Sequence, residues 1–127
     1  MTENKQSEIY SRAKSFQYAY EGWRYVLKTQ HNAWIHAIVS LLVFGLAYWL
    51  KLPARDWAVL ILTIVVVWIA EFMNTAIEAV VDLSQGEFHP IAKIAKDVAA
   101  AAVLLGAVGA FIVGLLIMGP PLWNRLF

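Results

Sequence analysis

Three long apolar runs follow a polar N-terminal segment along the chain. They cover residues 33–50, 57–81 and 98–119. Each run is close to the length of about 20 residues that a helix needs to cross a bilayer. The pattern therefore predicts an all-α integral membrane protein, in which residues 1–127 form a single membrane domain with three transmembrane helices.

Prolines separate the apolar runs. Pro53 lies in the short polar turn after the first run, and Pro90 closes the longer polar connection after the second. Pro120 and Pro121 follow the third run. Because proline interrupts the hydrogen-bond ladder of a helix, we expect the third helix to end at this pair.

Residues 8–30 show a different helical pattern. Apolar and aromatic side chains recur there at steps of three and four, and basic residues fall mostly off that face. A helix with aromatic residues on one face and cations elsewhere typically lies in the membrane surface. We therefore expect an amphipathic surface helix. A soluble helix packed on another domain is the alternative, but the sequence indicates no other domain.

Composition agrees with a membrane protein and excludes several function classes. Hydrophobic residues make up 61% of the chain and charged residues 15%, whereas soluble domains carry roughly 25% charged residues. The net charge of +1 excludes nucleic-acid binding driven by bulk charge. The absence of Cys excludes a disulfide scaffold and a thiol nucleophile. Lys and Arg gather in the N-terminal segment and the second connection, so the positive-inside rule predicts a cytoplasmic N-terminus.

Four polar residues with helical spacing interrupt or follow the second apolar run, namely Glu71, Asn74, Glu78 and Asp82. At about 100° per residue they share one narrow stripe of the helix. Ionisable residues inside a span are costly and usually functional. Their oxygens suit Mg²⁺, and a buried glutamate can act as a general base. A structural stripe of interhelical hydrogen bonds and a proton or ion pathway are the alternatives.

Other polar residues are less informative alone. Lys96 could bind phosphate oxygens as a point charge, although a lysine at such a place is more typically a snorkelling anchor. Glu87 and His89 lie in the second connection, where polar residues are usually solvated. His31 and His36 are five residues apart and do not share a helical face, which argues against zinc. No GxxxxGK[ST] loop is present, so a nucleotide would bind through other groups.

The run from Glu71 to Asp82 has the pattern ExxNxxxExxxD. It closely resembles the motif of the prokaryotic diacylglycerol kinase family, which also includes undecaprenol kinases. The resemblance extends over about residues 12–114 and includes Glu-Phe-His-Pro at 87–90. It implies a homotrimer of three-span subunits in the bacterial inner membrane. It also implies transfer of the ATP γ-phosphate to a lipid hydroxyl, with diacylglycerol as the first choice of acceptor and undecaprenol as the alternative.

The resemblance implies roles for individual residues. Glu71 matches the general base and Glu78 a ligand of the Mg²⁺ that accompanies ATP. Asn74 and Asp82 match supporting positions. The nucleotide-contacting positions are matched by Tyr18, Glu78, Glu87, His89, Lys96 and Asp97. An ion-conducting assembly or a scaffold would not need Lys96 and Asp97 beside the carboxylate stripe.

One position departs from the family pattern. Gln30 stands where many members carry a second metal-ligating Glu. A Gln amide oxygen can still coordinate Mg²⁺, but it brings no charge to the site. We expect either a weaker metal affinity or a contribution from another carboxylate, such as Glu21.

Overall fold

A computed structural model of the protein describes residues 2–84 and 89–127, with the side chains of 11–83 and 89–127. These residues form four α-helices, which are α1 (Thr2–Thr29), α2 (His31–Trp49), α3 (Ala54–Ser84) and α4 (Pro90–Leu126). The last three are long and apolar enough to cross a membrane. A helix pairs its backbone polar groups internally, as the interior of a bilayer requires. The predicted all-α membrane fold with three spans is confirmed.

The chain divides into two compact units, Met1–His31 and Asn32–Phe127. The first unit consists mainly of α1, which begins at Thr2 rather than at residue 8. The additional N-terminal turns contain Glu, Lys and Gln, which are good helix formers. The apolar periodicity does not reach these turns, and it therefore marks only the later part of the helix.

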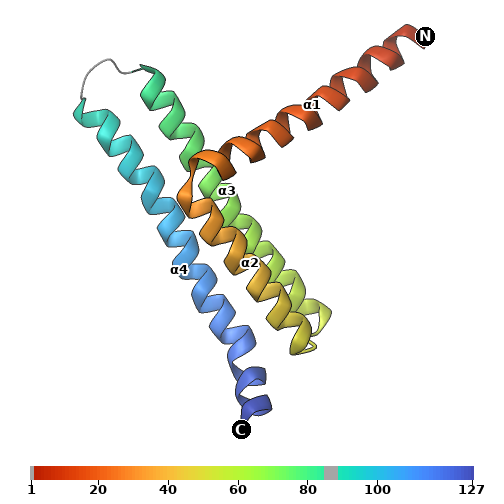
Figure 1. Ribbon diagram of the computed structural model, residues 1–127, viewed down its shortest axis with the longest axis vertical. Coiled ribbons are helices and arrows are strands. Elements are labelled where there is room, and N and C mark those ends of the chain that lie inside the picture. The colour runs from red at the N-terminus through yellow and green to blue at the C-terminus, as the bar shows by residue number, and fades with distance from the viewer. Residues whose placement is uncertain (1, 85–88) are drawn as a thin grey trace. The chain divides into compact units, whose positions relative to one another are not determined.

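The second unit is built from α2, α3 and α4, which run alongside one another (Figure 1). Val67 of α3 and Val103 of α4 are buried in this unit. A Cβ atom placed on Gly106 of α4 would lie 3.8 Å from Cγ2 of Val67, so these helices approach closely there. Phe44 of α2 stacks on Trp57 of α3, with 5.9 Å between the ring centroids. These contacts hold the three helices together near their middle and at the first turn.

α2 ends in a Schellman motif. The Leu52 N–H donates to the Ala47 carbonyl at 3.2 Å, and the Lys51 N–H donates to the Tyr48 carbonyl at 3.0 Å. These two bonds satisfy carbonyls that the end of a helix leaves without an intrahelical partner. The motif requires Lys51 to adopt a φ of 55°, in the left-handed region that favours glycine. Pro53 follows immediately before α3, where a helix breaker is expected.

The third helix does not end at Pro120 and Pro121 as expected, because α4 continues through both to Leu126. Each proline lacks the N–H of the helical ladder, but its fixed φ suits a helix. Arg125 anchors the turns beyond them by donating from Nη1 to the Trp49 carbonyl at 3.0 Å. Its guanidinium also lies 4.6 Å from the centroid of the Trp49 ring. This attachment to the end of α2 helps offset the two missing ladder bonds.

Candidate active site

The polar stripe of α3 continues the face that packs inside the helical unit. Leu60 and Val67 are buried on this helix, and Glu71 and Asn74 follow them with helical spacing. The Glu71 side chain is only 1% exposed, and Asn74 is 8% exposed. The sequence thus places a carboxylate where an apolar packing residue would otherwise lie.

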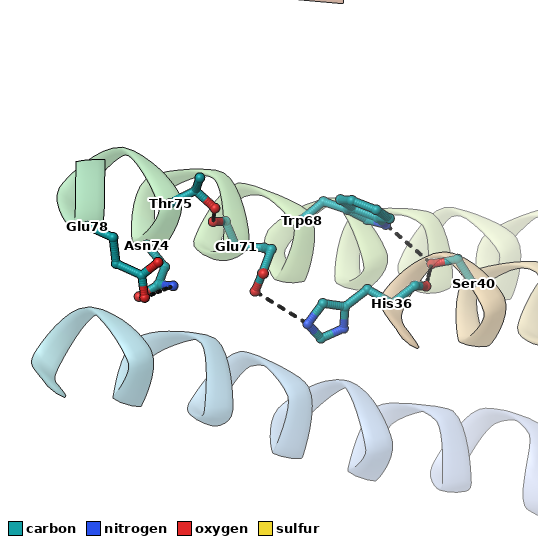
Figure 2. A network of polar contacts seen from close by, with 7 residues as sticks. All are labelled: His36, Ser40, Trp68, Glu71, Asn74, Thr75 and Glu78. Atoms are coloured by element: carbon teal, nitrogen blue, oxygen red, sulfur yellow. Dashed lines mark hydrogen bonds and ion pairs between the residues drawn. The ribbon is translucent and has the colours of Figure 1, made fainter. Parts of the chain in front are cut away.

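The Glu71 carboxylate points toward α2 and approaches one residue there (Figure 2). Its Oε2 lies 3.6 Å from Nε2 of His36, which is too far for a hydrogen bond and makes an ion pair only when the imidazole is protonated. Among the described residues, neither Glu71 oxygen has a hydrogen-bond partner, and Nε2 of His36 also lacks one. Buried polar atoms without partners are rare and costly. This pair is therefore a candidate for chemistry.

His36 is linked to α3 through its backbone carbonyl and by an edge contact of its ring. Nε1 of Trp68 donates to Oγ of Ser40 at 3.3 Å, and that hydroxyl donates to the His36 carbonyl at 2.6 Å. The rings of His36 and Trp68 meet edge to face, with centroids 6.3 Å apart. On the other side of the pair, Oγ1 of Thr75 donates to the Glu71 backbone carbonyl at 2.9 Å. Ser40, Trp68 and Thr75 thus bond to one another or to backbone carbonyls. None of them donates to the Glu71 carboxylate (Figure 2).

Asn74 and Glu78 form the next part of the stripe. Nδ2 of Asn74 donates to Oε1 of Glu78 at 3.2 Å, which orients the half-buried carboxylate. The Asn74 Oδ1 atom is buried and has no hydrogen-bond partner among the described residues. These oxygens fit a hard divalent cation such as Mg²⁺. No group of three or more His, Asp or Glu side chains that could hold a metal gathers in the described part of the chain. Other oxygens, such as those of phosphates and water, would have to complete the shell.

Two lysines near the start of α4 pair with carboxylates. Nζ of Lys96 lies 2.5 Å from Oδ1 of Asp82 and joins α4 to the end of α3. Nζ of Lys93 lies 2.5 Å from Oδ2 of Asp97 on the same helix. The structure therefore brings Lys96 to the end of the carboxylate stripe, where the resemblance implies a phosphate-binding cation.

The remaining predicted site residues lie farther along the chain. His89 caps α4, and its Nδ1 accepts a hydrogen bond from the Ile91 N–H at 3.2 Å. Tyr18 belongs to α1 and has an exposed side chain. Gln30 follows α1, and its backbone N–H donates to the Val26 carbonyl at 2.9 Å. Glu87 lies outside the described residues.

Sequence reasoning overlooked His36 as a partner of Glu71. The signal was present, because His36 and Ser40 are the only clearly polar residues in the first apolar run and stand four residues apart. Residues with that spacing share a helical face. The spacing of His36 from Ser40 is therefore more informative than its spacing from His31.

Comparison with known sequences gives this polar cluster a context. The sequence model of the family described as Prokaryotic diacylglycerol kinase matches residues 17–118. The chain belongs to that family. All the described polar residues of α3, together with His36, Lys96 and Asp97, lie inside the matched region of this family member.

Three relatives from the prokaryotic diacylglycerol kinase family illustrate its range. A diacylglycerol kinase of Synechocystis is 50% identical over 113 residues, which cover 88% of this chain and 65% of the relative. An undecaprenol kinase of Bacillus subtilis is 36% identical over 121 residues, covering 95% and 98%. A diacylglycerol kinase of Escherichia coli is 37% identical over 95 residues, covering 69% and 78%. The match thus spans 65% of the length of the Synechocystis protein but nearly all of the Bacillus protein.

Proposed function

We propose that the protein is a lipid kinase that transfers the γ-phosphate of ATP to the hydroxyl of diacylglycerol at the cytoplasmic face of the membrane. The observation that carries this proposal is the buried Glu71 carboxylate, whose oxygens have no hydrogen-bond partner among the described residues. In a member of a kinase family, such a group is suited to accept the proton of an incoming hydroxyl.

In this mechanism Glu71 takes the proton from the lipid hydroxyl while the hydroxyl oxygen attacks the γ-phosphorus. The bond between that phosphorus and the bridging oxygen breaks, and ADP leaves with the electron pair. Phosphoryl transfer depends mainly on positioning and on charge neutralisation. Lys96 serves this need by turning its ammonium from Asp82 toward the phosphate oxygens. The other proposed nucleotide contacts are Tyr18, Glu78, Glu87, His89 and Asp97.

Mg²⁺ is part of the proposal, with Glu78 as its ligand and Asn74 as the residue that orients the Glu78 carboxylate. The hydrogen bond of 3.2 Å between these two side chains supports this division of roles. When bound, Mg²⁺ would neutralise charge on the ATP phosphates. Gln30 would supply a further, uncharged oxygen. We also propose a homotrimer with cytoplasmic N-termini in the bacterial inner membrane.

Undecaprenol is the second candidate acceptor. The undecaprenol kinase of Bacillus subtilis aligns with this chain over 98% of its own length, whereas the more similar Synechocystis diacylglycerol kinase aligns over 65%. Both lipids present a primary hydroxyl joined to a long apolar tail. The same general base therefore suits either acceptor. An assay in which the two lipids compete distinguishes them.

A competition assay tests the proposal. Purified protein is placed in a bilayer that contains both lipids at equal concentration, and radiolabelled ATP is added with Mg²⁺. We expect label in phosphatidic acid, and labelling that is slower by about 10²- to 10⁴-fold with a Glu71→Gln variant that retains its helical content. Label in undecaprenyl phosphate alone would replace the first acceptor by the second. Label in neither lipid, from folded protein, would overturn the kinase proposal in favour of ion conduction or scaffolding.

A further inference from the structure

Glu71 faces an energetic difficulty that its own helix does not solve. Its side chain is 1% exposed and lies within a membrane-spanning helix. An ionised carboxylate in such a place is costly unless a donor or a cation compensates it. A protonated carboxyl would avoid the cost, but it could not accept a proton from a hydroxyl. A base at this position therefore needs a partner.

Among the described residues near Glu71, His36 is the one that can compensate the charge of its carboxylate. Glu78, on the same helix, carries a like charge and cannot compensate Glu71. Three charged side chains of α4 pair elsewhere or lie at its far end, namely Lys93, Lys96 and Arg125. Asp97, also on α4, carries the wrong sign and pairs with one of these lysines. The compensating contact that the described residues offer to Glu71 is the one of 3.6 Å with Nε2 of His36.

The surroundings of His36 suit a positioning group. Its backbone carbonyl accepts the Ser40 hydroxyl, and that hydroxyl accepts the indole N–H of Trp68. This arrangement links α2 to α3 beside the imidazole (Figure 2). An imidazole that meets Trp68 edge to face can direct its N–H toward one carboxylate oxygen and leave the other free for substrate.

We infer that His36 is a positioning residue for Glu71, a role that rests on the proposed function. Its Nε2–H faces Oε2, keeps the carboxylate ionised and leaves Oε1 turned toward the lipid hydroxyl. His36 keeps its own proton throughout the reaction. The proton of the hydroxyl goes to Glu71, so His36 acts on the reaction only through that residue.

Two substitutions separate this role from simple packing. His36→Leu fills much of the space but removes the N–H, whereas His36→Gln keeps an N–H donor at similar reach. We expect His36→Leu to lower kcat about 10- to 100-fold, as losses of orienting partners commonly do, with the KM for ATP unchanged. His36→Gln should recover most of that loss. Equal losses in both variants would show that the donor is not what matters.

The pH dependence of kcat provides a readout that packing would not move. Without the His36 donor the protonated form of Glu71 is favoured, so the acidic limb of the profile should move to higher pH in His36→Leu. His31→Leu is the matched control, since His31 is exposed at the first turn of α2. Its profile should match that of the wild type. An unshifted limb in His36→Leu would overturn the inference.

A double variant gives the sharpest result. If His36 acts only through Glu71, adding His36→Leu to Glu71→Gln should cause no further loss, because coupled residues are not additive. Fully additive losses would refute the inference. Wild-type protein is assayed in parallel on both lipids. Absence of wild-type transfer would refute the kinase proposal, whereas wild-type activity with insensitive His36 variants would refute only the positioning role.

Discussion

The ammonium of Lys96 and the carboxylate of Asp82 lie 2.5 Å apart and join the start of α4 to the end of α3. Their side chains are 37% and 66% exposed, so solvent and salt weaken the pair and it contributes little to stability. The pair matters instead because it positions the Lys96 ammonium. A partly exposed ammonium held at the end of the carboxylate stripe can exchange Asp82 for a phosphate group at small cost.

Replacing Lys96 by Met should impair the use of ATP. A hydrogen bond to a charged group contributes about 1.5–3 kcal/mol, so we expect the KM for ATP to rise about 10- to 100-fold. Steady-state kinetics with varied ATP at saturating lipid measures this change. Lys51→Met is the control, because Lys51 lies in the turn before α3, at the opposite end of that helix from Asp82, and should have little effect. Similar KM values in the two variants would remove Lys96 from the phosphate site.

Replacing Glu71 by Gln should slow the chemical step. The amide preserves size but cannot accept the hydroxyl proton, and loss of a general base typically lowers the rate by about 10²- to 10⁴-fold. We expect kcat to fall in this range while equilibrium binding of ATP is retained. The opposite pattern, lost ATP affinity with unchanged turnover of the bound complex, would identify Glu71 as a binding residue.

Replacing Glu78 by Gln should weaken the binding of Mg²⁺ with ATP, because a formal charge leaves the proposed metal site. Activity should fall by orders of magnitude and recover in part at high Mg²⁺ or with Mn²⁺. Metal titrations of activity at fixed ATP and lipid measure the effect. If the variant keeps an ordinary metal dependence and full activity, Glu78 is not a ligand.

Replacing Gln30 by Glu should have the opposite effect on metal use. The family resemblance places Gln30 at the position of a metal-ligating Glu, and a charged oxygen is a stronger ligand for Mg²⁺ than an amide. The Mg²⁺ concentration for half-maximal activity should fall, and the choice of lipid should not change. Superimposable titration curves for the two proteins would exclude Gln30 from the metal shell.

Lys51→Gly should stabilise the turn between α2 and α3. Lys51 adopts a φ of 55°, and a side chain in the left-handed region costs roughly 1–2 kcal/mol. Part of this gain is lost to the greater freedom of glycine in the unfolded chain, so we expect roughly 0.5–1 kcal/mol. Thermal unfolding in detergent measures the shift. Lys51→Ala removes the charge but keeps the Cβ, and an equal gain there would assign the effect to charge instead.

The sequence predicts those features that depend on one helix at a time. Periodicity alone predicts the three spans and the shared face of Glu71 and Asn74, because spacing and rotation are fixed within a helix. The contacts between two helices are not predicted by periodicity. The continuation of α4 past Pro120 is accompanied by an attachment to Trp49, and the pairing of His36 with Glu71 depends on how α2 is turned against α3. Neither rotation is encoded in a local pattern.

The buried Glu71 also bears on how the chain enters the membrane. On insertion scales, a carboxylate near the centre of a span adds about 2.5–3.5 kcal/mol to the free energy of partitioning a helix into lipid. The apolar majority of α3 compensates for this. His36 belongs to the preceding helix and is therefore synthesised before Glu71. If α2 and α3 insert as a hairpin, the same contact that orients the carboxylate also shields it from lipid during biogenesis.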